Sequence, residues 1–241
     1  MQPNLWDILG QKTFNTELRE GEIDPRAADN ILLAWPPILE LMTKNYLQTK
    51  GIKVLDFGCG AGGFCQKLNS LGFKVAGIDP SIGMIESAKL HTSQSIQYIL
   101  GDQHKLPQGE TFSVITSIMT FPFIENVSET FGALSTALKP TGLLCFAVFN
   151  PDWVRDCLKS NISFSSFDSI ENPKKGLKIF GELQTPVYIR NAQEYSEIAK
   201  NVGLSKILEA YPPFTPEFIS KYPDNRPKHL SEYIILGFQK K

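Results

Sequence analysis

The feature that most constrains this chain is a short apolar run that turns through glycines into a helical pattern. Residues 52–57 form the apolar run, residues 58–63 are rich in glycine, and residues 64–71 read as a helix. A buried strand that leads through such a turn into a helix is typical of α/β sheets, where ligands bind at the carboxyl ends of the strands. Since glycine adopts positive φ and carries no side chain, we predict that a ligand lies across this turn.

Alternation of strands and helices continues along most of the chain. The predicted helices are 81–91, with Ser81 as N-cap, 125–138 and 192–201. The predicted strands are 73–78, 96–100, 112–118, 142–149, 204–211 and 232–238. Strands that are apolar throughout indicate a parallel sheet buried on both faces, so the pattern predicts a doubly wound α/β sheet.

The flanking segments suggest four parts. We expect residues 1–50 to form an arm and a helix that covers the cleft, with a kink at Pro36 and Pro37. Residues 51–150 would form the ligand-binding core. Residues 151–190 break the rhythm and are expected to form an insertion or cap over the substrate, and residues 191–241 would complete the sheet, with a proline-rich loop over 212–227.

Composition argues against several classes of protein. The formal net charge is −1 and no basic stripe is present, which disfavours a nucleic-acid partner. The four cysteines form no CxxC pair and only three histidines occur, so we predict no metal site. No signal-peptide pattern and no apolar run of about 20 residues is visible, and we expect a cytoplasmic monomer or homodimer without a membrane span.

Two ligands compete for the glycine turn. Gly58, Gly60 and Gly63 satisfy the G-x-G-x-x-G fingerprint of NAD sites, where a pyrophosphate lies over the helix N-terminus. Asp56 at the strand end would repel a pyrophosphate and attract the ammonium and sulfonium of S-adenosylmethionine. The sign of this charge favours S-adenosylmethionine. An NAD(P)-dependent oxidoreductase and a non-catalytic adenosine-ligand-binding protein stay as alternatives.

Acidic residues also end the next two strands. Asp79 lies about 20 residues after the glycine turn, where a carboxylate can accept hydrogen bonds from ribose hydroxyls. Asp102 could accept from an adenine amino group, or it could cap a turn. Met84 could pack on the adenine ring.

These motifs resemble class I S-adenosylmethionine-dependent methyltransferases, in the group of small-molecule enzymes similar to the ubiquinone and menaquinone methylases. Residues 54–62 resemble the family motif V-L-D-x-G-C-G-x-G, and residues 138–144 resemble its L-K-P-G-G turn. The resemblance implies a Rossmann-like, seven-stranded, mostly parallel sheet with helices on both faces and an antiparallel last strand. The cofactor-binding candidates it implies are Asp56, Gly58, Cys59, Gly60, Asp79, Pro80, Met84, Gly101, Asp102, Gln103, Ser117 and Met119.

The acceptor side is less regular. Many relatives carry a polar residue after the fourth strand, whereas this chain has the apolar stretch 119–123, which suggests an apolar or aromatic acceptor. Methyl transfer would then depend mainly on proximity and orientation. The acceptor-site candidates are Trp6, Phe14, Phe121, Asn150, Trp153, Tyr188 and Arg190, and the weak catalytic candidates are His229, Tyr188 and Arg190.

Overall fold

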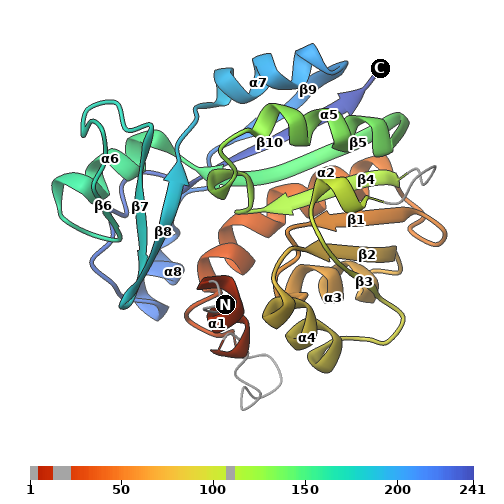
Figure 1. The fold of residues 1–241 in the computed structure, drawn as a ribbon, viewed down its shortest axis with the longest axis horizontal. Coiled ribbons are helices and arrows are strands. Elements are labelled where there is room, and N and C mark those ends of the chain that lie inside the picture. Colours follow the sequence, from red (N-terminus) through yellow and green to blue (C-terminus); the bar gives the residue numbers. More distant parts are fainter. Residues whose placement is uncertain (1–4, 13–22, 107–111) are drawn as a thin grey trace.

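A seven-stranded sheet forms the centre of the molecule (Figure 1). The structure is a computed structural model that describes residues 5–12, 23–106 and 112–241. Along the sheet the strand order is β3-β2-β1-β4-β5-β10-β9. The bounds are β1 (Lys53–Phe57), β2 (Lys74–Asp79), β3 (Gln97–Leu100), β4 (Phe112–Ile118), β5 (Leu138–Phe149), β9 (Leu204–Ala210) and β10 (Tyr233–Lys240).

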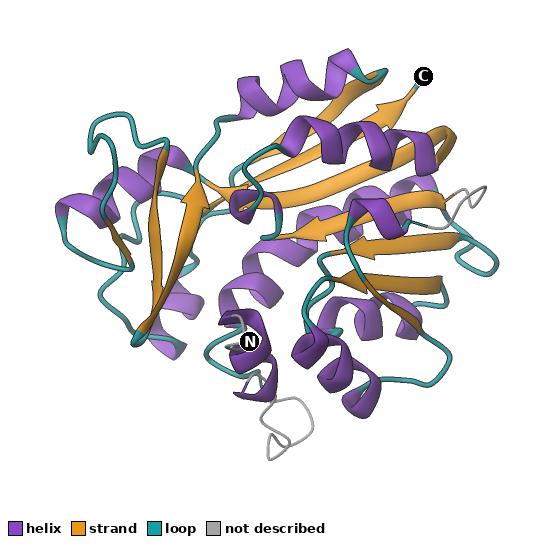
Figure 2. Cartoon of the chain, viewed as in Figure 1, coloured by secondary structure: helices purple, strands orange, loops and turns teal. Residues whose placement is uncertain are grey.

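Helices cover both faces of this sheet (Figure 2). Side chains alternate along a strand, so Val54 of β1 faces one apolar cluster and its neighbour Leu55 faces the other. The first cluster includes residues of α2 (Trp35–Asn45), α3 (Gly63–Ser70) and α4 (Ile82–His91). The second includes residues of α5 (Val127–Ala137) and α7 (Ala192–Asn201). Burial on both faces explains why the strands are continuous apolar runs.

Strand directions bring one set of strand ends together. Strands β3, β2, β1, β4 and β5 pair in parallel, so their carboxyl ends lie at one edge of the sheet. The last strand, β10, runs antiparallel to both β5 and β9. The predicted fold class, with its antiparallel last strand, is therefore confirmed.

The segment after β5 forms a small unit of its own. It contains α6 (Pro151–Lys159) and a three-stranded antiparallel sheet of β6 (Phe164–Ser165), β7 (Lys175–Phe180) and β8 (Leu183–Tyr188). In Figure 1 this unit stands beside the carboxyl ends of the parallel strands. We refer to residues 151–190 below as the cap.

The start of the chain lies against the same edge. Helix α1 (Leu5–Lys12) packs on α4, and Asp7 accepts hydrogen bonds from the Ser81 hydroxyl at 2.7 Å and the Gly83 N–H at 3.2 Å. Ser81 is the N-cap of α4, as predicted.

The kink predicted at Pro36 and Pro37 corresponds to a change from π-helix to α-helix just before these prolines. A π-helical turn, η1 (Asn30–Ala34), leads into α2, and Pro36 falls in the first turn of α2. Proline is tolerated there because the first N–H groups of a helix have no partner within it.

Short elements complete the chain. They are the 3₁₀ turns η2 (Gln103–Lys105) and η3 (Phe121–Phe123) and the helix α8 (Pro216–Lys221). Helix α8 interrupts the loop predicted over 212–227, because Thr215 caps it by accepting from the Phe218 N–H. Within the ranges described, no helix has the length and apolar character needed to cross a membrane.

Candidate active site

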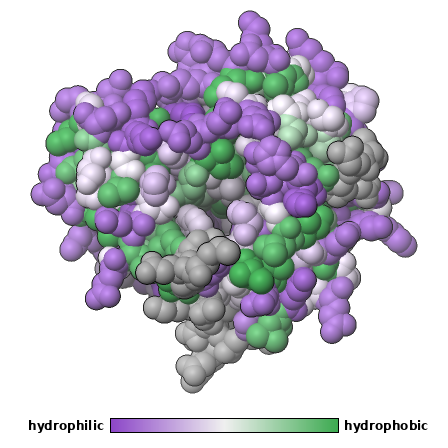
Figure 3. Space-filling model, viewed as in Figure 1, coloured by the Kyte–Doolittle hydropathy of each residue, from purple (hydrophilic) through white to green (hydrophobic). Residues whose placement is uncertain are grey.

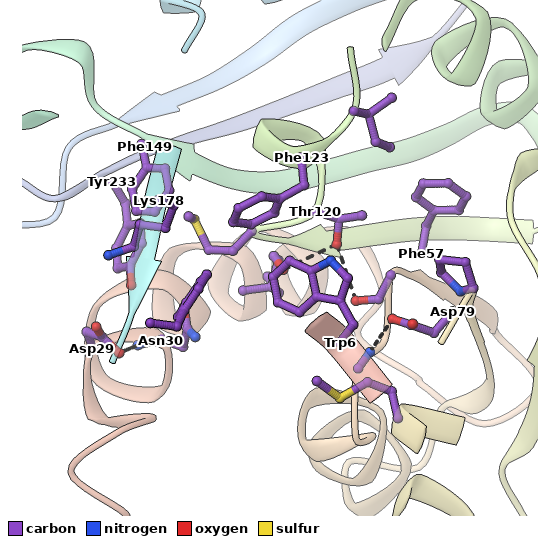
Figure 4. Close-up of a pocket in the computed structure, with 18 of the residues that line it drawn as sticks. Trp6, Asp29, Asn30, Phe57, Asp79, Thr120, Phe123, Phe149, Lys178 and Tyr233 are labelled. Atoms are coloured by element: carbon purple, nitrogen blue, oxygen red, sulfur yellow. Dashed lines mark hydrogen bonds between the residues drawn. The ribbon is translucent and has the colours of Figure 1, made fainter. Parts of the chain in front are cut away.

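A cavity of about 760 Å³ opens at the carboxyl edge of the sheet. In the space-filling view, apolar surface lies beside a central hollow on this face (Figure 3). Figure 4 shows Asp79 and Thr120 toward one end of the cavity, Lys178, Phe149 and Tyr233 toward the other, and Trp6 with Phe123 between them. We call the first end the donor half and the second the acceptor half, after the ligands that the sequence predicts there.

The glycine turn forms one wall of the donor half. Gly58 has a φ of 72° and Gly60 a φ of 52°, values that side-chain-bearing residues rarely adopt. A Cβ on Gly58 would lie 2.0 Å from the Thr120 Oγ1, so this position also requires glycine for space. Several N–H groups of the turn already have partners: Gly58 and Cys59 donate to the Ile78 carbonyl, Gly60 to Asp79, and Gly62 to the Cys59 carbonyl.

Asp79 is held rigidly on the cavity wall. Its Oδ2 accepts from the Gly60 N–H and its Oδ1 from the Ser81 N–H, both at 2.9 Å. Burial raises the pKa of Asp79, and these two hydrogen bonds oppose that rise. Each carboxylate oxygen has a second lone pair, so Asp79 can still accept from hydroxyl groups of a ligand.

Further predicted cofactor residues line the same half. Asp102 lies on the wall although its Oδ1 also caps η2, by accepting from the His104 N–H at 3.0 Å. The turn-capping role that the sequence left open is therefore observed, and contact with an adenine stays a prediction. The other predicted cofactor residues on the cavity wall are Gly58, Gly60, Pro80, Met84, Gly101, Gln103 and Met119.

Asp56 does not face the cavity, which corrects the prediction made for it. Its side chain shares the α3 face of β1 with Val54, and it accepts from the Thr116 hydroxyl at 2.8 Å and the Cys65 thiol at 3.5 Å. Burial raises the pKa of Asp56 to about 6, while these two donors lower it. Strand alternation thus places this carboxylate beneath the glycine turn.

Cys59 and Ser117 are corrected in the same way. Both are buried, and neither lines the cavity. The Cys59 Sγ packs close to Gly77, where an added Cβ would approach it to 2.8 Å. Ser117 lies within β4 on the face opposite to Thr116, because neighbouring strand residues point in opposite directions.

The charges of the donor half nevertheless disfavour a diphosphate. Its charged wall residues are Asp79 and Asp102, and no basic side chain is among the donor-half residues that the structure describes. A diphosphate needs cations or free N–H groups, whereas much of the glycine turn's N–H capacity is already used within the protein. This geometry fits a ligand that carries positive charge and hydroxyl groups.

Aromatic side chains form much of the acceptor half. Trp6 of α1 contacts Phe123 edge-on at 4.8 Å between ring centroids and Phe180 of β7 at 5.7 Å. Phe149 and Tyr233, from the facing ends of β5 and β10, line the far end. These aromatic walls give the acceptor half an apolar surface that can hold a planar or apolar molecule.

A group of charged residues closes the far end. Arg226 donates to Asp29 and Glu232 at 2.8 Å each, and also to Asp224 at 2.8 Å. Burial raises the pKa of Glu232 to about 8, with repulsion from Asp29 adding to the rise and Arg226 opposing it. Burial also lowers the pKa of Lys178, which lies nearby on β7.

Three acceptor-site candidates do not line the cavity, because their side chains belong to packed layers behind the wall. Phe121 is fully buried and contacts Phe131 and Phe146, since successive residues of η3 point in different directions. Asn150 caps α6 and donates to the Ser231 carbonyl at 2.9 Å. Trp153 is fully buried, and its indole N–H donates to the Pro227 carbonyl at 3.0 Å.

The catalytic candidates also lie outside the cavity. Tyr188 packs under the cations of Lys175 and Arg190. Arg190 donates to the carbonyls of Ile124 and Glu125, so it positions the chain that follows η3. His229 is an exposed side chain that pairs with Asp156 at 3.0 Å.

Trp6 is the one acceptor-site candidate found on the cavity wall, and Phe14 lies outside the described residues. Sequence reasoning missed several wall residues. The sequence contained a signal for two of them: Lys178 and Phe180 are two positions apart in a short strand, so their side chains lie on the same face. Ile118, Thr120 and Phe123 lie in the stretch around the end of β4 that the sequence pointed to, and the missed residues are Pro25, Arg26, Asp29, Asn30, Phe57, Ile78, Ile124, Phe149, Ser163, Lys178, Phe180, Arg226, Glu232 and Tyr233.

A family model described as a methyltransferase domain matches residues 22–209 of the chain. The chain belongs to this methyltransferase family. Among curated proteins, the ubiquinone biosynthesis O-methyltransferase of Rhodopseudomonas palustris (strain BisB5) is 34% identical over 106 residues, which are 43% of this chain and 42% of that protein. The corresponding protein of Bartonella bacilliformis is 36% identical over 107 residues, 43% of each chain. The chain thus matches less than half the length of these curated relatives.

Solved structures agree in fold. An S-adenosylmethionine-dependent methyltransferase from Mesorhizobium loti has a TM-score of 0.63 at 18% identity, with 90% of this chain and 100% of that chain covered. Magnesium protoporphyrin IX methyltransferase from Synechocystis, solved with bound SAH, has a TM-score of 0.61 at 15% identity, with 92% and 90% covered. These findings confirm the predicted family and give no support to the oxidoreductase alternative.

Proposed function

We propose that this chain is an S-adenosylmethionine-dependent methyltransferase that acts on a small apolar or aromatic acceptor. The observation that carries the proposal is the donor half, whose charged wall residues are two carboxylates and whose glycine turn uses several of its N–H groups internally. Such a wall suits a sulfonium and an ammonium and opposes a diphosphate.

The residues of the donor half fit this donor. Asp79 would accept hydrogen bonds from the ribose hydroxyls, and Asp102 with Gln103 would face the adenine beside Met84. Asn30 lines the cavity, and in Figure 4 it lies beside Asp29, on the side of Lys178. Its Oδ1 is buried and receives no hydrogen bond from another described residue, and because buried polar atoms normally have partners, this oxygen supports a hydrogen-bond donor group on a ligand.

The donor supplies an electrophilic methyl group on a sulfonium, and the protein's task is to hold an acceptor in line with it. None of the three histidines lines the cavity. Trp6, Phe123 and Phe180 would hold the acceptor by packing and exclude water from it. Catalysis would therefore come mainly from proximity and orientation, while a hydroxyl acceptor would pass its proton to water or buffer after transfer.

Calorimetric titration tests the donor assignment directly. We expect S-adenosylmethionine and S-adenosylhomocysteine to bind at micromolar concentration and NAD to bind at least about tenfold more weakly, from the sign of the wall charge. Transfer of labelled methyl from the donor to phenolic acceptors then separates an enzyme from a non-catalytic adenosine-binding protein. Tighter binding of NAD would overturn the proposal.

Asp79→Ala tests the ribose contact. The variant should bind S-adenosylhomocysteine about 5- to 150-fold more weakly, equivalent to about 1–3 kcal/mol for stranded polar contacts. Asp224→Ala is a matched control, because this carboxylate lies outside the cavity wall and pairs with Arg226. Equal affinity of the Asp79→Ala variant and the unaltered protein would show that the ribose lies elsewhere.

The remaining expectations belong to the same proposal. All four cysteines are free and buried, which supports a reducing compartment such as the cytoplasm. The near-neutral net charge of −1 supports a small-molecule acceptor over a nucleic acid. A monomer or homodimer stays part of the proposal, and sedimentation analysis would distinguish the two.

A further inference from the structure

Lys178 occupies an unusual place in the acceptor half. It lies in the middle strand of the cap sheet and lines the cavity. Its Nζ is 4.7 Å from the ring centroid of Phe164, 5.3 Å from that of Phe180 and 5.8 Å from that of Phe149. Figure 4 places its side chain beside Phe149 and Tyr233 at the end of the cavity away from Asp79. The ammonium therefore lies in an aromatic setting inside the substrate space.

The neighbouring cation has a very different environment. Arg226 is surrounded by three carboxylates, those of Asp29, Asp224 and Glu232, each at 2.8 Å. No hydrogen bond or ion pair joins the Lys178 ammonium to any side chain or carbonyl in the described ranges. Aromatic faces stabilise a cation, but they accept none of its three N–H bonds in the way an oxygen does.

The half-buried Lys178 side chain thus places its ammonium in the cavity without a hydrogen-bond acceptor from the described residues. Removing a charge from water is costly unless an opposite charge or hydrogen bonds replace the water. Among nearby acidic groups, Glu232 has the largest electrostatic effect on the pKa of Lys178. Its side chain already accepts a hydrogen bond from Arg226. Burial lowers the pKa of Lys178, and a ligand anion beside it would act against this shift.

From this geometry we propose that Lys178 binds an anionic group of the methyl acceptor, with a carboxylate as the best fit. The acceptor would then be an aromatic acid whose ring lies among Trp6, Phe123 and Phe180 and whose acidic group points away from the methyl donor. This inference rests on the proposed function, because it takes the donor to occupy the half that contains Asp79.

A paired series of ligands tests the inference. The probes are 4-hydroxyphenyl carboxylic acids with one to four methylenes between ring and carboxylate, each matched with its primary amide. Binding to protein saturated with S-adenosylhomocysteine is measured by calorimetry. The variants are Lys178→Met and Lys178→Gln, with Lys175→Met as the control, since Lys175 lies on the same strand but pairs with Glu125 at the surface. Circular dichroism verifies that each variant folds.

We expect at least one acid to bind the unaltered protein about 10- to 100-fold more tightly than its amide, as for a hydrogen-bonded charged pair. The Lys178 variants should lose this preference, and Lys175→Met should retain it. Three results contradict the inference: acids that bind no better than amides, no binding by any acid, or an acid preference that persists without Lys178. Failure of S-adenosylhomocysteine to bind in the first titration would instead contradict the proposed function.

Discussion

The carboxyl group of Glu232 is buried at the entrance to β10, although it accepts a hydrogen bond from Arg226. Its pKa of about 8 shows that loss of hydration outweighs the attraction of the arginine. In the unfolded chain this group would titrate near its ordinary value of 4.5. The folded protein therefore holds a proton on Glu232 that the unfolded chain releases.

This difference predicts a pH dependence of stability. The stabilisation from protonated Glu232 is complete below about pH 4.5 and is lost as the pH rises through about 8, because the folded state binds the proton more tightly. Glu232→Gln carries no titrating proton, so its free energy of unfolding should fall less steeply across this range. Urea unfolding of both proteins between pH 5 and pH 8 measures the difference, and parallel curves would contradict the prediction.

Two aspartates show how much of the site can be predicted from sequence patterns at the level of single residues. Asp56 and Asp79 were both recognised as acidic residues at strand ends, yet only Asp79 faces the cavity. Asp79 is the last residue of β2 and turns toward the ligand edge, whereas Asp56 is one residue inside β1 and points beneath the glycine turn. A shift of one position along a strand reverses the face, and the apolar pattern leaves the exact strand end open by a residue or two.

At the scale of elements, strands and helices of the sheet were predictable because their apolar residues are contiguous or periodic. The observed α7 has the predicted bounds of 192–201, and β4 has the predicted bounds of 112–118. The cap sheet and α8 were missed. Their strands and helix are short and their apolar residues few, so serine, lysine and proline dominate the local pattern.

Helix α1 approaches α4 through two glycines. A Cβ on Gly83 would lie 2.5 Å from the Asp7 carbonyl oxygen, and one on Gly10 would lie 2.5 Å from the Gly83 carbonyl carbon. The two backbones therefore meet without intervening side chains. This close contact sets the position of Trp6 on the cavity wall.

Gly83→Ala should displace α1. Backbone hydrogen exchange in residues 5–12 should quicken at least about tenfold, because the added methyl breaks the contact that holds the helix. Gly132→Ala in α5 is the control, since nothing lies within 4 Å of its added Cβ. The control should leave this exchange unchanged and stabilise the protein by about 0.5–1 kcal/mol through helix propensity. Unaltered exchange in Gly83→Ala would show that the glycine contact does not hold α1.

Across the whole molecule, Arg226 connects segments that are far apart in the chain. It pairs with Asp29, which is 197 positions away and caps η1, and with Glu232 at the entrance to β10. No local pattern predicts such a pairing, because it arises only when the finished sheet brings the segment before β10 to the start of η1. The sequence therefore revealed the donor half, built largely from residues near the glycine turn, but not the charged end of the acceptor half.

Arg226→Met should lower the free energy of unfolding by about 3 kcal/mol, because it leaves the partly buried carboxylates of Asp29 and Asp224 without their counter-charge and removes the hydrogen bond to Glu232. Arg155→Met is the matched control. Arg155 pairs with the exposed Asp152, so its loss should cost about 1 kcal/mol or less. Urea denaturation compares the two variants, and equal losses would mean that the Arg226 network adds no more than a surface pair.

The two halves of the cavity differ in the stretches of chain that supply their walls, although Trp6 and Asp29 of the acceptor half come from the first 30 residues. The donor wall is built from residues between Phe57 and Thr120, whereas the far wall takes Phe149, Lys178, Phe180 and Tyr233 from later segments. Substitutions in those later segments would therefore alter the proposed acceptor site while the proposed donor site stays unchanged. New substrate preferences in descendants of this protein should accordingly be traceable to the cap and to the stretch before β10.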